Sequence, residues 1–345
     1  MTETRPHRSD MLRVALAGAG MISHYHLTAW SRLGNRAKVV AIADPDRAKA
    51  ALRAEAFDIP AVYTDVAEML TAEQIDAIDI ASPRETHGEN VEYAASRGID
   101  VLCQKPLAPT LALSESLVHS LGGRVRLMVH ENWRFRPWYR RMKHWLEEGA
   151  VGDLLLGNMT SISSALLPDA TGNIPALVRQ PFMAGETRLL IAESLIHEMD
   201  VVRWLMGPLR VVAARASRGI DEVKGETLSA IFMETANGAP VIVTGAMTAP
   251  GFPSRGQDRF ELIGTRGSAV VDGTAAKLLG PRLDSQDYDF DEGYQASFDG
   301  VIAHFADCLE SGARFETDPT DNLETLRLVE HAYWAAGLHN PDVGP

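Results

Sequence analysis

The sequence predicts an α/β protein of two domains, in which a parallel sheet covered by helices is followed by an α+β domain built on a mostly antiparallel sheet. From residue 12 onward, short apolar runs alternate with helix-length segments, as in buried parallel strands joined by helices. Past about residue 135, apolar residues instead recur at every second position between tight turns, as in antiparallel strands. The 345 residues suffice for two domains of ordinary size, and we place them at 10–135 and 136–345.

The first domain is expected to repeat a strand–helix unit. Its strands are predicted from the apolar runs at 12–17, 39–43, 77–81, 99–103 and 125–129. Its helices are predicted in the segments between them, near 22–33, 46–57, 85–97 and 110–121. Because parallel strands joined in this way have right-handed crossovers, ligand sites are expected where the strands end.

The second domain is expected to begin with an amphipathic helix at 137–148. Hairpins are predicted where two strands flank a turn that contains glycine: 227–235 and 241–248 flank Asn237-Gly238, and 259–263 and 268–271 flank Thr265-Arg266-Gly267. A helix at about 191–206 interrupts these strands. Two more helices, near 296–310 and 320–336, are expected to close the chain.

The composition excludes several classes of partner. Lys and Arg number 33 against 46 Asp and Glu, for a net charge of −13, so phosphate backbones and anionic lipid surfaces should repel the chain. We therefore expect neither a nucleic acid nor a membrane as partner. Only Cys103 and Cys308 occur, which fits a reducing compartment, and Arg13 interrupts the N-terminal apolar stretch that loosely imitates a secretory signal. A cytoplasmic enzyme with a small-molecule substrate is the expectation.

A glycine turn between the first strand and the first helix predicts a dinucleotide site. In Gly18-Ala19-Gly20-Met21-Ile22-Ser23, Gly18 permits the tight turn and Gly20 lets the backbone approach a pyrophosphate. The N–H groups of the following helix would face the phosphates. The third glycine of the usual fingerprint is absent, but Ser23 is small enough for close packing of helix and strand.

An acidic residue strengthens this prediction. Asp44 ends the second apolar run, where a carboxylate would bind the ribose hydroxyls and repel a 2′-phosphate, so NAD is favoured over NADP. The alternative is that Asp44 and Asp46 merely cap the next helix, with Asp46 the better cap.

Three downstream segments carry a resemblance to a known family. They are Ala81-Ser82-Pro83 with His87, Gln104-Lys105-Pro106-Leu107-Ala108, and Asn132-Trp133-Arg134-Phe135-Arg136-Pro137. In order and spacing this set resembles the Gfo/Idh/MocA family of sugar and polyol dehydrogenases. The resemblance continues through 149–153, 197–200 and 264–268 and covers nearly the whole chain.

The resemblance implies an N-terminal Rossmann domain, a C-terminal open sheet and an active site between the two. It makes Lys105 the catalytic acid/base and sets Glu193 and His197 at the positions of the family's Asp-x-x-x-His pair. The residues expected to bind NAD are Gly18, Gly20, Met21, Ile22, Asp44, Ser82, Pro83, His87, Gln104, Lys105 and Asn132. Those expected to bind substrate are Asn132, Trp133, Arg134, Arg179, Glu193 and His197. Four residues depart from the family pattern: Arg84 for Asn, Gln104 for Glu, Glu193 for Asp and Leu195 for Gly.

The chemistry of Lys105 can also be argued from its position. Oxidation of an alcohol moves a hydride to the nicotinamide while a proton leaves the oxygen. Lys105 follows an apolar strand, so its ammonium should lie at the strand end where the cofactor binds. Partial burial and the positive nicotinamide ring would favour the neutral amine that accepts this proton. The alternative is an ordinary surface lysine at a strand end.

Glu193 and His197 are four positions apart in a predicted helix and should therefore share one face. There His197 would bond the reacting oxygen and Glu193 would orient the imidazole or a neighbouring hydroxyl. A histidine simply packed near Trp204 is the alternative. No metal is expected, because the helix offers one His and no third ligand at helical spacing. Trp133 could equally belong to a core between domains, and Arg179 could be solvated.

These residues predict an NAD-dependent oxidoreductase that takes a hydride from a secondary alcohol or lactol of a sugar, polyol or sugar acid. An NAD-dependent glycoside hydrolase or lyase that uses transient oxidation is one alternative, since Gln104 and Glu193 could mark such a divergence. A non-catalytic NAD-binding regulator is another, although it would have no need of Lys105 and His197. The run 188–193 with His197 is similar to members that act on short sugars such as apiose. A homodimer or homotetramer is expected from the family's open sheet.

Overall fold

The computed structural model describes residues 11–338, and its contacts form two compact units. The first unit runs to Asn132 and includes Tyr294–Leu323. The second comprises Trp133–Gly293 and continues from Glu324. The predicted domains, 10–135 and 136–345, are each one continuous segment. The first unit of the structure, in contrast, also includes Tyr294–Leu323 from late in the chain. The outer limits predicted at residues 10 and 345 lie outside the described residues.

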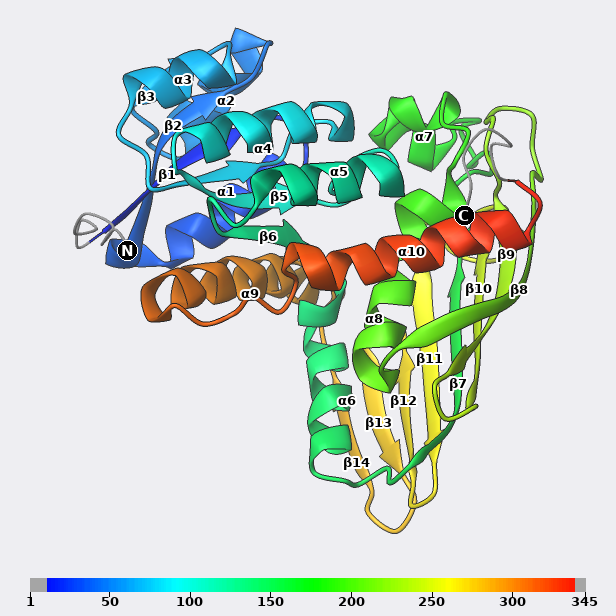
Figure 1. Cartoon of the computed structure of the whole chain (residues 1–345). Helices are drawn as coiled ribbons and strands as arrows, with labels where there is room; N and C mark the ends of the chain where they lie inside the picture. Colours follow the sequence, from blue (N-terminus) through cyan, green and yellow to red (C-terminus); the bar gives the residue numbers. More distant parts are fainter. Residues whose placement is uncertain (1–10, 339–345) are drawn as a thin grey trace. The chain divides into compact units, whose positions relative to one another are not determined.

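The first unit contains a 6-stranded sheet of order β3-β2-β1-β4-β5-β6, and all of its strand pairs are parallel (Figure 1). Its strands are β1 (Leu12–Ala17), β2 (Ala37–Ala43), β3 (Ala61–Tyr63), β4 (Ala77–Ile80), β5 (Asp100–Gln104) and β6 (Leu127–His130). The predicted parallel sheet is confirmed. The short strand β3 was not predicted, because three residues are too few to show a periodicity. The order reverses between β1 and β4, so the ends of these two strands mark the position where such sheets bind ligands.

Helices cover both faces of this sheet. They are α1 (Ser23–Arg32), α2 (Arg47–Ala56), α3 (Val66–Ala72), α4 (His87–Ser96), α5 (Leu111–Leu121) and most of α9 (Phe290–Ser311). The helices α3, α4 and α5 share one apolar core with Ile78 and Ile80 of β4. Asp79, which lies between them, points to the opposite face because side chains alternate along a strand, and there it accepts a hydrogen bond from Trp30 of α1.

The second unit contains an 8-stranded sheet of order β14-β13-β12-β11-β7-β10-β9-β8. Its strands are β7 (Leu154–Ile162), β8 (Leu209–Ser217), β9 (Leu228–Thr235), β10 (Pro240–Ala246), β11 (Gln257–Gly264), β12 (Ser268–Asp272), β13 (Ala275–Leu279) and β14 (Asp284–Asp287). Only β7 and β10 pair in parallel; every other pair in the sheet is antiparallel. Both predicted hairpins form, as β9–β10 and β11–β12, and the mostly antiparallel sheet is confirmed.

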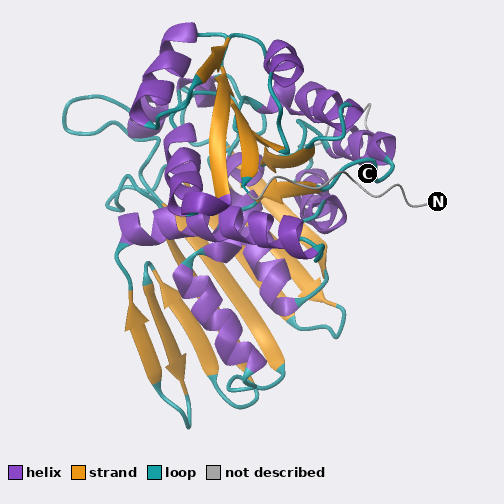
Figure 2. Ribbon diagram, turned by 90° about the vertical axis from the view of Figure 1, so that its left-hand side faces the viewer, coloured by secondary structure: helices purple, strands orange, loops and turns teal. Residues whose placement is uncertain are grey.

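Helices lie over one face of this sheet (Figure 2). Helix α6 (Pro137–Glu147) packs on β12 and β13, and α8 (Ile196–Met206) packs on β7. Burial alternates along β11 accordingly, since Phe260 and Leu262 are buried whereas Arg259 and Ile263 are exposed. Helices α7 (Pro175–Arg179) and α10 (Pro319–Ala335) complete the described elements. Between residues 11 and 338, the helices are all too short or too polar to cross a membrane.

The helix predicted at about 191–206 is correct only in part. Residues Leu190–Leu195 form a π-helical segment, and the α-helix α8 begins at Ile196. Glu193 and His197 therefore stand on either side of a change in helix geometry, so the face-sharing argument from regular α-helical spacing does not hold for them as it was made.

Candidate active site

The glycine turn after β1 is forced by its surroundings. Gly18 has φ +100°, and a Cβ atom there would lie 2.7 Å from the carbonyl oxygen of Ala81, which follows β4. The Gly18 N–H also donates to the carbonyl oxygen of Ala43, at 2.8 Å. A side chain at position 18 is thus excluded by backbone on the neighbouring strand. At Gly20, by contrast, a Cβ would meet no atom within 4 Å, so the space beside it is open.

Asp44 supports this turn from the end of β2. One carboxylate oxygen accepts the N–H of Ala19 at 2.7 Å, and the other accepts the N–H of Asp46 at 2.8 Å. The cap of α2 is Asp46, whose side chain accepts the N–H groups of Ala48 and Lys49 and whose pKa these hydrogen bonds lower. The capping role considered for Asp44 therefore belongs to Asp46, as the better cap, and Asp44 holds the turn in which a dinucleotide would sit.

Ser23 takes the place of the third glycine without loss of packing. Its side chain is buried, and its hydroxyl donates to the carbonyl oxygen of Gly20 at 2.6 Å while accepting from Nε of Arg53 at 3.0 Å. Helix α1 begins at this residue. Met21, just before it, is 46% exposed, and Ile22 is half-buried. The turn, with its open side at Gly20, is a cradle that fits a pyrophosphate.

His87 ties together the loops that follow β4 and β5. Its Nδ1 lies 2.8 Å from the carbonyl oxygen of Pro106, and its Nε2 lies 2.9 Å from that of Ser82. The ring is buried, and this burial lowers the pKa of His87. Its contacts are to backbone, so it supports the loops that carry Ser82, Pro83 and Lys105. Lys105 itself is half-buried and directly follows β5.

Two polar residues predicted at the cofactor site are held by hydrogen bonds of their own. Asn132, after β6, is buried, and its amide nitrogen donates to Oγ of Ser297 on α9 at 2.8 Å. Gln104, the last residue of β5, accepts the N–H of Lys105 at 2.8 Å through its side-chain oxygen. The residues expected to bind NAD thus follow the ends of β1, β2, β4, β5 and β6 at one edge of the sheet.

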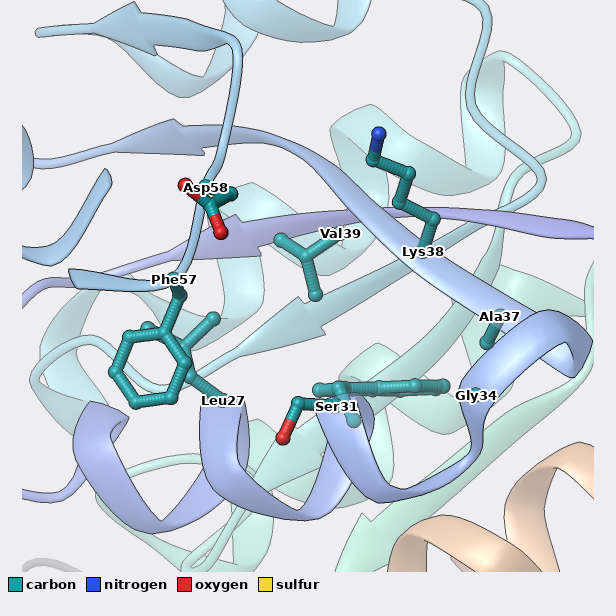
Figure 3. Close-up of a pocket in the computed structure, with 9 residues that line it drawn as sticks. Leu27, Ser31, Gly34, Ala37, Lys38, Val39, Phe57 and Asp58 are labelled. Atoms are coloured by element: carbon teal, nitrogen blue, oxygen red, sulfur yellow. The ribbon is translucent and has the colours of Figure 1, made fainter. Parts of the chain in front are cut away.

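A pocket of about 200 Å³ lies elsewhere in the first unit (Figure 3). Its lining includes Ala37, Lys38 and Val39, which begin β2, together with Leu27 of α1 and Phe57. The amino end of β2 lies at the edge of the sheet opposite the glycine turn. This pocket is therefore not part of the candidate site.

In the second unit, His197 is stacked on an indole ring. The rings of His197 and Trp133 are 4.0 Å apart between centroids and 7° from parallel. The guanidinium of Arg136 lies over the Trp133 ring, at 3.4 Å from its centroid. The aromatic partner of His197 is thus Trp133 rather than Trp204. His197 and Arg136 thus both pack against the Trp133 ring.

A buried carboxylate organises the residues behind this stack. Asp258 of β11 accepts hydrogen bonds from Nε1 of Trp133 at 3.2 Å, Nη1 of Arg136 at 2.9 Å and the hydroxyl of Tyr139 at 2.8 Å. Glu198, next to His197, is also buried, and desolvation together with the nearby Asp258 raises its pKa well above the ordinary value. The layer behind His197 therefore contains the Asp258 side chain, which accepts these three hydrogen bonds, and the Glu198 carboxyl group, whose raised pKa favours the neutral form.

The π-helical segment that carries Glu193 is also held from behind. Glu226 is buried, and its carboxylate accepts the N–H of Leu189 at 3.3 Å and that of Ile191 at 2.9 Å. The hydroxyl of Tyr333 donates to the same carboxylate at 2.5 Å. Burial beside this carboxylate raises the pKa of the Tyr333 hydroxyl, which keeps it a donor. A side chain thus satisfies the free N–H groups at the start of the segment.

Two arginines predicted to bind substrate differ in their surroundings. Arg134 is buried and donates to both carboxylate oxygens of Asp200, at 2.7 and 2.5 Å. Such a bidentate pair is typical of a structural ion pair. Arg179 is exposed at the end of α7. Across residues 11–338, no group of three or more His, Cys, Asp and Glu side chains is arranged to hold a metal ion.

Sequence reasoning did not find Asp258, Glu226 or Tyr333. Asp258 and Glu226 are acidic residues in or beside strands of alternating pattern, where a polar residue normally faces water. Arg136 belongs to the segment 132–137 that carries the family resemblance, but the sequence predicts no role for its side chain. These acidic residues could have been found only if they were known to be buried. The alternation along a strand predicts burial once it is known which of its residues face the core.

These features define a class of protein. A parallel sheet with the order 3-2-1-4-5-6, a glycine turn after its first strand and an acidic residue after its second is a dinucleotide-binding fold. The chain belongs to the GFO/IDH/MocA family of oxidoreductases. The family model described as "Oxidoreductase family, NAD-binding Rossmann fold" matches residues 12–130, and "GFO/IDH/MocA C-terminal domain" matches residues 139–270.

Individual relatives agree with this membership. The chain is 32% identical to D-apiose dehydrogenase of Paraburkholderia graminis over 93% of this chain and 87% of the relative. It is 30% identical to inositol 2-dehydrogenase 4 of Saccharopolyspora erythraea over 87% of this chain and 86% of the relative. The crystal structure of an oxidoreductase from Agrobacterium radiobacter in complex with NAD+, L-tartaric acid and magnesium is similar, with a TM-score of 0.87, 29% identity and coverage of 94% of this chain and 96% of that chain.

The family predicted from the motifs is therefore confirmed, as is an oxidoreductase that uses NAD. The hydrolase, lyase and regulator alternatives receive no support from these comparisons. The assignment of single residues to cofactor and substrate stays a prediction.

Proposed function

We propose that the protein oxidises a secondary alcohol or lactol of a sugar, polyol or sugar acid, with D-apiose as the first candidate substrate. The observation that carries this proposal is the 32% identity to a D-apiose dehydrogenase over 93% of the chain. The similarity to an inositol 2-dehydrogenase, at 30% identity, makes myo-inositol the second candidate. Both substrates offer a ring carbon that bears a hydroxyl group and a hydrogen.

Bound NAD supplies the hydride acceptor in this chemistry. The open side of the turn at Gly20 would receive its pyrophosphate, and the helix N-terminus after Met21 would direct N–H groups toward it. Asp44 is half-exposed and engaged only with backbone N–H groups, so it offers further lone pairs to ribose hydroxyls. Ser82 and Pro83 follow β4, and Asn132 follows β6, at the same edge of the sheet.

Lys105 is the proposed proton acceptor. It is half-buried, and it follows a strand at the edge of the sheet that carries the glycine turn. Removal of hydride from a carbinol carbon requires that the hydroxyl proton leave to a base, and a neutral lysine amine can accept it. His197 and Glu193 are proposed to bind the substrate hydroxyl groups. The stack on Trp133 fixes the plane of the His197 ring, and Glu226 holds the segment that carries Glu193.

The test is a substrate panel followed by substitution. D-apiose, myo-inositol and L-tartrate are each incubated with the protein and NAD or NADP, and NADH or NADPH formation is followed by absorbance. We expect turnover with D-apiose and NAD. Lys105→Ala should then lower turnover by about 10²–10⁴-fold, which is much more than it changes NADH binding, followed by fluorescence. Turnover within threefold of the unchanged protein would remove Lys105 from the mechanism, and turnover of myo-inositol alone would replace the proposed substrate.

We further propose a cytoplasmic homodimer or homotetramer that assembles through the open face of the 8-stranded sheet. Exposed apolar side chains on this sheet include Phe232 at 38%, Ile242 at 38% and Ile263 at 42%. Both cysteines are free thiols, which agrees with a reducing compartment. Light scattering should give a multiple of the chain mass, and Phe232→Asp should reduce it. A monomer at micromolar concentration would contradict this assembly.

A further inference from the structure

We propose that Gln104 is a positioning residue, whose amide fixes the backbone of Lys105 and at the same time holds two buried histidines, His26 and His130, as neutral imidazoles. This rests on the proposed role of Lys105 as proton acceptor. Gln104 makes contacts in three directions: to the N–H of Lys105 at 2.8 Å, to Nε2 of His26 at 3.2 Å and to Nδ1 of His130 at 3.4 Å.

The orientation of the Gln104 side-chain amide follows from its contact with the backbone N–H of Lys105, which has only one possible role in a hydrogen bond. A backbone N–H can only donate, so the group of Gln104 that faces Lys105 N must be the carbonyl oxygen. The NH₂ group then faces both imidazoles, and it can only donate. Nε2 of His26 and Nδ1 of His130 must therefore each present a lone pair.

The other side of His26 fixes its proton. Oδ2 of Asp79 lies 2.8 Å from Nδ1 of His26 and also accepts the indole N–H of Trp30 at 2.7 Å. A carboxylate oxygen accepts, so the His26 proton is on Nδ1 and its Nε2 is free of hydrogen. This is a neutral imidazole in one tautomer, with each ring nitrogen used once.

His130 is held in the opposite tautomer. Because its Nδ1 accepts from Gln104, a single proton on the ring belongs on Nε2. The centroids of the His26 and His130 rings are 4.3 Å apart, a distance at which two imidazolium charges would repel strongly in a buried place. Neutral rings avoid that cost.

Side chains from β4 and α9 lie beside the two rings. Asp79 faces them from β4, whereas Cys103, the residue before Gln104 on β5, points to the other face of the sheet and packs in the core that contains Ile80. Helix α9 contributes the apolar ring of Phe298, at 5.3 Å from His26 and 5.0 Å from His130 between centroids. Glu131, which follows His130, is buried as well. Asp79 thus bonds the pair directly, through His26.

A carboxylate cannot replace this amide without a proton. It would accept the N–H of Lys105, but it would then turn a lone pair toward the lone pair on Nε2 of His26. The conflict disappears only if one proton is taken up, either by His26 or by the new carboxyl group. Gln104→Glu should therefore bind one more proton in the folded state than in the unfolded state at neutral pH, whereas Gln104→Met should not.

Two measurements test this without any substrate. In the full-length protein labelled with ¹⁵N-histidine, the ring signals of His26 and His130, assigned by single substitutions, should report opposite neutral tautomers at neutral pH with and without NAD. In thermal unfolding, the Tm of Gln104→Glu should fall progressively below that of the unchanged protein as the pH rises. The sign follows because a group whose folded pKa is raised stabilises at low pH and loses this contribution as the pH passes that value. Gln104→Met, the size-matched control, should lower Tm by an amount independent of pH.

Activity then connects the network to Lys105. With D-apiose, Gln104→Met should lower kcat by about 5- to 20-fold, the worth of one to two lost hydrogen bonds, and this loss should exceed any change in the KM for NAD. An imidazolium signal for His26 at neutral pH, or equal and pH-independent Tm losses in both variants, would overturn the inference. These outcomes are independent of the proposed substrate, whose failure would appear as absent turnover in the unchanged protein.

Discussion

Alanine at Gly18 and at Gly20 should have opposite signatures, because the structure gives the two glycines different reasons to lack a side chain. At Gly18 a Cβ would lie 2.7 Å from the carbonyl oxygen of Ala81 and 2.8 Å from the N of Ser82, on backbone with φ +100°. A left-handed φ costs an L-residue about 1–2 kcal/mol, and displacing packed backbone costs about 1–3 kcal/mol more. The free energy of unfolding should fall by about 2–5 kcal/mol.

Gly18→Ala should thus lower the Tm of the ligand-free protein by about 4–20 °C, at about 2–4 °C per kcal/mol for a unit of this size. Gly20→Ala should leave that Tm unchanged within about 2 °C, because its Cβ would meet no atom within 4 Å. It should instead raise the dissociation constant of NADH by at least about tenfold, about 1.4 kcal/mol, since the methyl group would occupy the side of the turn that a pyrophosphate approaches.

The assay pairs differential scanning fluorimetry of the ligand-free protein with titration of NADH fluorescence. Each variant serves as the control for the other, because one change acts on folding and the other on binding. A Gly18→Ala protein with unchanged Tm would refute the contact with the segment after β4. A Gly20→Ala protein that binds NADH as tightly as the unchanged protein would refute the position of the pyrophosphate.

Three further substitutions examine the other groups. Asp44→Ser should weaken NAD binding by about tenfold or more and narrow the preference over NADP, because the negative charge and the two hydrogen bonds from the N–H groups of Ala19 and Asp46, which hold the turn, are lost; an unchanged ratio in parallel titrations would contradict the ribose assignment. Burial and Asp258 raise the pKa of Glu198, so its contribution to stability is complete below the ordinary pKa of a glutamate and is lost as the pH rises through the folded value. The Tm of Glu198→Gln relative to the unchanged protein should therefore climb by about 3–5 °C per pH unit above about pH 5, and parallel curves by calorimetry would speak against a neutral Glu198. Trp133→Leu should lower kcat/KM by about 2- to 13-fold through loss of the stack on His197, while Trp133→Phe retains most of it; equal losses would assign the effect to the indole N–H instead.

The parts of the fold that the sequence predicted well are those set by neighbours in the chain. The strands of the first unit appear as unbroken apolar runs because both faces are buried, and the turn at Gly18 depends on residues next to one another. The hairpin around Asn237-Gly238 is likewise local, and Gly238 has φ +83° as such a turn requires. Local sequence patterns of this kind predict structure without any knowledge of the tertiary fold.

The parts that could not be predicted depend on partners distant in the chain. The π-helical form of Leu190–Leu195 is held by Glu226 and Tyr333, and the sequence of the segment itself does not predict either partner. The burial of Arg134 follows from Asp200, which a helical pattern alone would present as one more polar residue. The position of Tyr294–Leu323 in the first unit depends on contacts with residues that lie much earlier in the sequence.

A common principle links these distant partners to the proposed chemistry. Groups predicted to face a ligand are each held by a polar contact from behind: Asp44 bonds the glycine turn, Gln104 bonds Lys105, and Asp258 bonds the indole on which His197 stacks. Apolar packing resists displacement but permits rotation about a side-chain bond, whereas a hydrogen bond also selects one orientation. Catalysis demands orientation, since a misplacement of about 1 Å can cost about 100-fold in rate. Substitutions in this second layer should accordingly lower turnover without contact to the ligand, and their effects should combine non-additively with those of the residues they hold.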